Sequence, residues 1–99
     1  MKNKIPKELL KGSLKSIVLK LLAENDKMYG YEITQKVDEL TGGKIQLTYG
    51  ALYPILHKLE KEGNLITESQ NVKNRIRIYY KLTPKGNSLA KEKIEELKD

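Results

Sequence analysis

The sequence predicts a mainly α-helical (α+β) fold, and two observations support this class. Apolar residues recur at helical spacing over residues 10–40, again over 48–62, and once more near the end of the chain. The alternation of apolar and polar residues that is typical of strands forms only one longer stretch, within residues 65–82. The 99 residues provide enough chain for one modest core. We therefore expect one structural unit, with residues 1–83 as its main body and residues 84–99 as a final helix.

Two helices are expected in the first part of the chain. The first has an apolar stripe of Leu10, Leu14, Ile17, Val18 and Leu21, and Asn25-Asp26 after it favours a turn. The second has a face of Tyr29, Ile33, Val37 and Leu40. We expect it to end at Thr41-Gly42-Gly43, because glycine readily takes the left-handed conformation that ends many helices. The following stretch, Lys44–Leu47, alternates and predicts a short strand.

The third predicted helix, Thr48–Glu62, has an unusual beginning. Its apolar face consists of Leu52, Ile55, Leu56 and Leu59, Thr48 suits the N-cap position, and Gly63 follows its end. Pro54 lies inside this helix, where it lacks an N–H group and crowds the carbonyl group of Gly50. Two tyrosines, Tyr49 and Tyr53, also lie in the first two turns.

A two-stranded ribbon and a last helix complete the pattern. Strand Leu65–Ser69, turn Asn71–Asn74 and strand Ile76–Leu82 are predicted. In the second strand Ile76, Ile78, Tyr80 and Leu82 share one face, and Arg75, Arg77, Tyr79 and Lys81 share the other. In the last helix Thr83 suits the N-cap, Pro84 the first position, and Ala90, Ile94 and Leu97 form a thin apolar stripe. This order predicts a winged helix-turn-helix with a two-stranded wing, in which the second helix of the pair enters the DNA major groove.

Composition argues against several classes of protein. The chain has no cysteine, which excludes disulfides, thiol nucleophiles and thiolate metal sites. Its single histidine, His57, argues against histidine metal cages and hydrolytic triads, and we interpret it as an ordinary surface residue rather than a phosphate contact or pH switch. No apolar run approaches the length that spans a membrane. We therefore expect a cytoplasmic, non-enzymatic protein with no cofactor, no metal and no membrane partner.

Positive charge is concentrated in two stretches. Residues 1–20 carry six basic and one acidic side chain, and residues 64–82 carry four basic and one acidic. Such clustering favours a polyanion partner over a general solubilising role. The chain has seventeen lysines but only two arginines, Arg75 and Arg77, and both lie in the wing beside Lys73. The planar guanidinium group of arginine can bind a phosphate with two hydrogen bonds or enter a narrow groove. We therefore expect Arg75 and Arg77 to contact DNA, together with the neighbouring cation Lys73.

The unusual start of the third helix suits the same partner. Gly50 and Ala51 keep that end of the helix thin, so backbone N–H groups can approach phosphate at the positive end of the helix dipole. Thr48, Tyr49 and Tyr53 supply hydroxyl groups for phosphates or base edges. The alternative interpretation is that the tyrosines only fill the rim of the core, as the leucines fill its centre.

Several motifs in order resemble one known family. They are Tyr29-Gly-Tyr-Glu-Ile33, Gly42-Gly43, Tyr49-Gly-Ala-Leu-Tyr-Pro54, Leu59-Glu-Lys-Glu-Gly63, and Tyr79-Tyr80-Lys-Leu-Thr83 followed by Lys85-Gly86. Over nearly its whole length, the chain resembles the PadR-family transcriptional regulators. The ordered set at these spacings is specific, although no single tripeptide is.

The resemblance implies a homodimeric transcriptional repressor that binds double-stranded DNA. It implies DNA contacts from Tyr31, Thr48, Tyr49, Gly50 and Tyr53 together with the wing. It implies that the last helix and often the first form the dimer contact, for which the apolar candidates are Leu9, Leu10, Ala90, Ile94 and Leu97. Two-fold symmetry in turn implies an inverted-repeat operator.

Two questions stay open at the level of sequence. Some relatives bind phenolic or other apolar effectors, but this chain has no tryptophan or phenylalanine for an aromatic drug-binding sandwich, and a small-molecule effector stays unknown. The alternative function is a winged-helix module for protein–protein interaction without DNA binding. The basic wing favours the regulator, because a wing that binds protein has no need of clustered cations.

Overall fold

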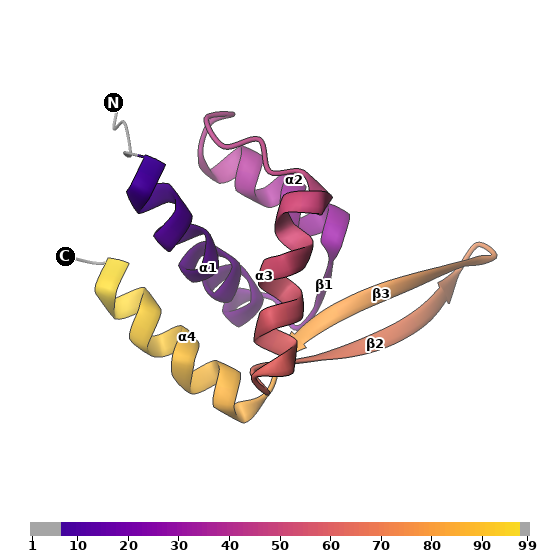
Figure 1. The fold of residues 1–99 in the computed structure, drawn as a ribbon. Helices are drawn as coiled ribbons and strands as arrows, with labels where there is room; N and C mark the ends of the chain where they lie inside the picture. Colours follow the sequence, from indigo (N-terminus) through magenta and orange to yellow (C-terminus); the bar gives the residue numbers. More distant parts are fainter. Residues whose placement is uncertain (1–6, 98–99) are drawn as a thin grey trace.

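The computed structural model describes residues 7–97, and the side chains of residues 14–95. The elements in order are α1 (Lys7–Glu24), β1 (Met28–Tyr29), α2 (Gly30–Leu40), α3 (Tyr49–Lys61), β2 (Leu65–Val72), β3 (Arg75–Leu82) and α4 (Pro84–Leu97). The predicted winged helix-turn-helix is confirmed. In Figure 1, α1 and α4 pack side by side on one side of α3, and the β2–β3 ribbon projects away from the helices on the other side.

The apolar stripes of the helices meet in one core. Its buried members are Val18, Leu19, Leu21, Leu22, Met28, Ile33, Val37, Leu47, Leu52, Leu56, Leu59, Leu65, Tyr80, Leu82 and Ala90. Leu52, Leu56 and Leu59 recur at helical spacing, so α3 turns one side fully into this core. The opposite side of α3 therefore faces outward over its whole length.

The sheet has three antiparallel strands in the order β1-β3-β2. β2 and β3 pair along their full lengths, from Leu65 opposite Leu82 to Val72 opposite Arg75. The turn consists only of Lys73 and Asn74, whose φ angles of 51° and 66° suit a two-residue hairpin loop. The predicted turn at 71–74 was therefore too long, because Asn71 pairs within the strand.

One predicted element was wrong, and another begins one residue later than predicted. Lys44–Leu47 is a loop rather than a strand, because its two apolar side chains anchor it to the core: Leu47 is buried, and Ile45 packs against the core. The Ile45 N–H group donates to the hydroxyl oxygen of Thr41 at 3.0 Å instead of joining a sheet. Tyr29, predicted as helical, is extended and forms β1 opposite Tyr79. A two-residue strand is too short to show alternation.

A compact junction connects the base of the wing to α4. The Thr83 hydroxyl group donates to the Gly63 carbonyl oxygen at 2.7 Å, and its oxygen accepts from the Gly86 N–H at 3.0 Å, as an N-cap should. A Cβ atom on Gly86 would lie 2.0 Å from the backbone carbonyl oxygen of Asn64. Glycine is therefore required here, and the predicted cap of α4 is confirmed.

Candidate nucleic-acid interface

The exposed start of α3 is organised by its N-cap. The hydroxyl oxygen of Thr48 accepts from the N–H group of Ala51 at 3.1 Å. Gly50 and Ala51 are both exposed, while the leucines that follow are buried beneath them. The first N–H groups of a helix have no partner within it and carry the positive end of its dipole. The first turn of α3 therefore presents hydrogen-bond donors and a thin backbone to the outside.

Gly50 has no structural reason to be glycine among the described residues. A Cβ atom there would meet only the Thr48 hydroxyl oxygen, at an ordinary contact distance of 3.9 Å. Glycine inside a helix costs up to about 1 kcal/mol relative to alanine. α3 also continues through Pro54, which removes the N–H group that the Gly50 carbonyl would otherwise accept from. Packing against other parts of the described structure therefore does not require glycine at position 50, and it leaves room there for the close approach of a ligand.

The Tyr49 side chain, although 47% exposed, makes two contacts with other elements of the protein. Its ring occupies the space where Gly30 lacks a side chain, since a Cβ atom on Gly30 would lie 2.2 Å from the Tyr49 Cε1 atom. Its hydroxyl group lies 3.3 Å from the hydroxyl group of Tyr80. Burial, together with this hydrogen bond, raises the pKa of the Tyr80 hydroxyl above its ordinary value. Tyr49 thus connects α3 to the start of α2 and to β3.

Tyr53 and Tyr31 are exposed as well. The Tyr53 ring is 5.8 Å from the Tyr49 ring and stacks on His57 at 5.7 Å, so the outer side of α3 carries an aromatic row. Tyr31, at the start of α2, is 65% exposed. Exposed aromatic rings with hydroxyl groups are suited to sugar faces and phosphate oxygens. The predicted contacts Tyr31, Tyr49 and Tyr53 are therefore all exposed to a ligand, and the Tyr49 hydroxyl group is also the partner of Tyr80.

The wing arginines have different surroundings. The Arg77 guanidinium carbon lies 4.0 Å from the centre of the Tyr29 ring, and Tyr29 contacts Tyr79 edge to face at 5.5 Å. The Lys27 ammonium group lies 5.1 Å from the Tyr79 ring centre and 2.6 Å from the Glu68 carboxylate. A guanidinium on a ring face keeps its N–H donors at its edge, and a hydrogen bond with Tyr79 engages this edge and raises the pKa of Arg77.

The other two predicted wing contacts, Arg75 and Lys73, are exposed at the far end of the ribbon. Sequence reasoning missed the roles of Tyr29, Tyr79 and Lys27. The contact between Tyr29 and Arg77 depends on β1, and no periodicity indicated that strand.

The predicted dimer residues are only partly described. Ala90 is 1% exposed and packs in the core of its own chain. Ile94 is half-buried on α4, which leaves it accessible to a partner. Leu9 and Leu10 in α1, and Leu97 in α4, have side chains outside the described residues.

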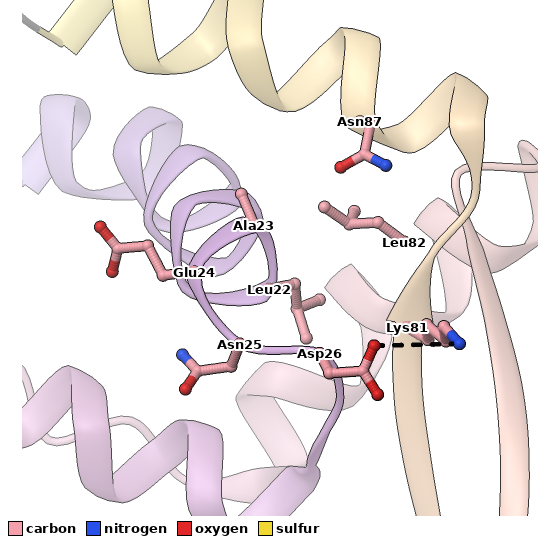
Figure 2. Close-up of a pocket in the computed structure, with 8 residues that line it drawn as sticks. All are labelled: Leu22, Ala23, Glu24, Asn25, Asp26, Lys81, Leu82 and Asn87. Carbon is pink, nitrogen blue, oxygen red and sulfur yellow. Dashed lines mark ion pairs between the residues drawn. The ribbon is translucent and has the colours of Figure 1, made fainter.

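Two shallow hollows flank α4. The first, of about 210 Å³, lies between the end of α1, β3 and the start of α4, and the ion pair of Lys81 with Asp26 at 3.9 Å is beside it (Figure 2). The second, of about 510 Å³, is lined by Lys15, Glu62, Asn64, Lys85, Ser88, Leu89 and Glu92. Neither lining includes an aromatic side chain, so these two hollows lack the stacking surface that an aromatic effector prefers.

Comparisons with known proteins agree with this architecture. Within residues 7–97, no helix is both long enough and apolar enough to cross a membrane. A transcriptional regulator of Mycobacterium tuberculosis is 31% identical over 93 residues, which are 94% of this chain and 83% of that protein. A solved transcriptional regulator from Clostridium thermocellum is similar with a TM-score of 0.80 and 31% identity, covering 91% of this chain and 87% of that one.

A PadR family transcriptional regulator from Eggerthella lenta is similar with a TM-score of 0.78 and 30% identity, covering 91% of this chain and 76% of that one. The family model described as transcriptional regulator PadR-like family matches residues 18–92, from the middle of α1 into α4. With this match and these relatives, the chain belongs to the PadR-like family of transcriptional regulators.

Proposed function

We propose that this protein is a sequence-specific DNA-binding regulator that acts as a homodimeric repressor on an inverted-repeat operator. The observation that carries the proposal is the start of α3, where a glycine without an internal cause lies among exposed tyrosines. Family membership supports regulation of transcription, and the geometry supports DNA as the ligand.

The proposed contacts follow from what each residue exposes. The N-terminal end of α3 enters the major groove, with Gly50 allowing the backbone N–H groups to approach a phosphate. Tyr31 and Tyr53 donate hydroxyl hydrogen bonds to phosphates or base edges. Lys73 and Arg75 contact phosphates from the wing, and Arg77 does so with the edge of a guanidinium that Tyr29 orients.

Dimerisation would place two copies of this surface on one face of the duplex. α1 and α4 pack along each other on the side away from the wing, so a partner docked there leaves both α3 helices outward (Figure 1). Two-fold symmetry then requires half-sites separated by one helical turn, about 10 base pairs, or a multiple of it. A dimer bound across a promoter blocks access of polymerase, which is the basis of the proposed repression.

Selection of binding sites from random duplex DNA, followed by titration of the selected site, tests this function. We expect an enriched inverted repeat and an affinity that decreases steeply with salt, because phosphate contacts release counterions. The control is the same duplex with both half-sites scrambled. No enrichment, or equal binding to both duplexes at every salt concentration, would contradict sequence-specific recognition and favour the protein-interaction alternative.

A further inference from the structure

Strand β2 forms an outer edge of the sheet, and no other strand of the described residues pairs with it there. β3 pairs with β2 over all eight residues without a bulge, so this edge is long and regular. Natural edge strands are usually shortened, bulged or protected by lysine or proline, because their unpaired N–H and C=O groups recruit other strands. β2, with the sequence LITESQNV, contains neither lysine nor proline, and Glu68 is its single charged residue. This edge therefore lacks the usual protection against pairing with another strand.

The hairpin turn determines which backbone groups of β2 point outward. Val72 and Arg75 flank the two-residue loop and form a hydrogen-bonded pair beside it. Because such pairs alternate along an antiparallel ribbon, the N–H and C=O groups of Thr67, Ser69 and Asn71 point away from β3. These three residues are exposed, and the ribbon projects away from the helices (Figure 1). Another strand can therefore approach this edge.

Two apolar side chains of β2 have no apolar partner across their own ribbon. Ile66, which is 52% exposed, lies opposite Lys81. Val72, near the far end of the same strand, lies opposite Arg75. Cross-strand pairs stabilise a sheet through contacts between matched side chains. Pairing within the hairpin thus leaves the apolar surface of both residues without such a match.

β2 is self-complementary when it pairs antiparallel with a second β2 strand about a two-fold axis at Ser69. This register places Ile66 opposite Val72 of the second copy, and Glu68 opposite Gln70 of the second copy. Symmetry produces each of these pairs twice. The polar pair matches chemically, since the Gln70 amide group already donates to the Glu68 carboxylate at 3.0 Å within one chain. A register shifted by two residues would instead place two copies of Glu68 opposite each other, where like charges repel.

We propose that the outer edge of β2 is an interface between two copies of this chain, which joins their three-stranded sheets into one. The occupant is a second copy because the same strand supplies both members of each matched pair. α1 and α4 lie on the other side of α3 from the ribbon, so this contact is separate from the proposed dimer contact and would join one dimer to the next (Figure 1). The inference goes beyond the proposed function and does not depend on it.

The absence of cysteine from the chain makes cross-linking through one introduced thiol a direct test. Ser69→Cys would place two thiols opposite each other on the two-fold axis, where the Cα atoms of a hydrogen-bonded pair lie about 5.5 Å apart, within disulfide range. Asn71→Cys is the matched control. Asn71 is exposed on the same face as Ser69, but in this register it would be displaced from its own copy by four residues, or about 13 Å along the strand.

Under mild oxidation without DNA, Ser69→Cys should form covalent dimers on the order of tenfold faster than Asn71→Cys, because only the former pair has disulfide geometry. Equal reactivity of the two variants toward a small thiol reagent verifies that both thiols are equally accessible. A thermal melt of each reduced variant verifies an intact fold.

Gln70→Glu tests the register in the protein without a thiol. The new carboxylate would face Glu68 of the second copy twice in each contact, while within its own ribbon it faces Arg77. The ribbon should therefore stay folded, and the dissociation constant of the contact, measured by sedimentation over a range of concentrations, should rise about tenfold.

Three results would overturn the inference. They are equal cross-linking of Ser69→Cys and Asn71→Cys, faster cross-linking of Asn71→Cys, and association of Gln70→Glu that is unchanged from the parent protein. Because no DNA is present in these measurements, each of these results would leave the proposed function standing.

Discussion

The hydroxyl groups of Tyr49 and Tyr80 lie 3.3 Å apart, and they join the first turn of α3 to β3, the central strand of the sheet. Both parts of the proposed DNA surface are therefore held at one relative angle. Because each hydroxyl is the other's partner, removal of either one should have the same effect as removal of both.

The prediction for this pair concerns Tyr80→Phe, Tyr49→Phe and the double variant. Each single change should lower the free energy of unfolding by about 1 kcal/mol, the typical net value of one hydrogen bond. Operator affinity should also decrease, because the angle between α3 and the wing is less restricted. Urea unfolding and operator titration of all four proteins form a double-mutant cycle. Additive losses would show that the two hydroxyl groups act separately.

Gly50→Ala should change stability and DNA binding in opposite directions. A Cβ atom has room in the free protein, so alanine should raise the free energy of unfolding by up to about 1 kcal/mol. The same methyl group lies where the helix start approaches DNA, so operator affinity should decrease on the order of tenfold. Thermal melts and operator titration measure the two effects. Unchanged affinity in a stabilised variant would argue against close approach at this residue.

Gly30→Ala provides the contrasting case. Its Cβ atom would overlap the Tyr49 ring, so the ring has to move and stability should decrease by about 1–3 kcal/mol, as in other overpacked sites. A thermal melt measures this change. The sign of the change in the free energy of unfolding on substitution by alanine thus distinguishes Gly50 from Gly30. A stabilised Gly30→Ala protein would contradict the described position of Tyr49.

Arg77→Lys and Arg75→Lys test whether the wing needs arginine rather than positive charge. Both variants keep the charge, so binding to unrelated DNA should change little. We expect operator affinity to decrease about fivefold for each site, since lysine cannot reproduce a bidentate contact. The loss should be larger at Arg77, because lysine also loses the planar stack on Tyr29. Equal binding by parent and variants would reduce the role of the wing to charge alone.

Ile94→Glu together with Leu97→Glu tests the proposed dimer helix. A carboxylate in an apolar seam is strongly unfavourable, so the double variant should sediment as a monomer and lose most operator affinity. Ala90 is unsuitable for this test, because its burial in its own chain would confound dimerisation with folding. Circular dichroism serves as the control for an intact fold. An unchanged dimer would assign the pairing to α1, through residues such as Leu9 and Leu10.

The helices and the wing could be predicted from the sequence because their signals are local. Apolar spacing defined the buried side of α3, and Thr48 and Thr83 cap the helices that they were expected to cap. β1 has only two residues, and its place depends on pairing with Tyr79 and Tyr80, which are far away in the chain. No local pattern contains that information.

Burial along the wing was harder to predict for a related reason. The sides of β3 were correctly separated by alternation, with Ile76 and Ile78 on the side of Tyr80. Alternation does not reveal where a strand leaves the core, and the ribbon extends beyond it (Figure 1). Likewise, the hydrogen-bond partner of the Tyr49 hydroxyl group could not be predicted, because Tyr80 lies thirty-one positions later in the chain.

The junction at Thr83 holds the base of the wing against the first turn of α4. One hydroxyl group connects the turn after α3 to the first turn of α4, and the Asn64 carbonyl group lies so close to Gly86 that a Cβ atom there would be 2.0 Å from its oxygen. The position of α4 against a partner would therefore also set the position of the base of the wing. In a dimer built on α4, the dimer contact would set the distance between the two bound half-sites. Substitutions in that contact would therefore change the preferred operator spacing without altering a residue that touches DNA.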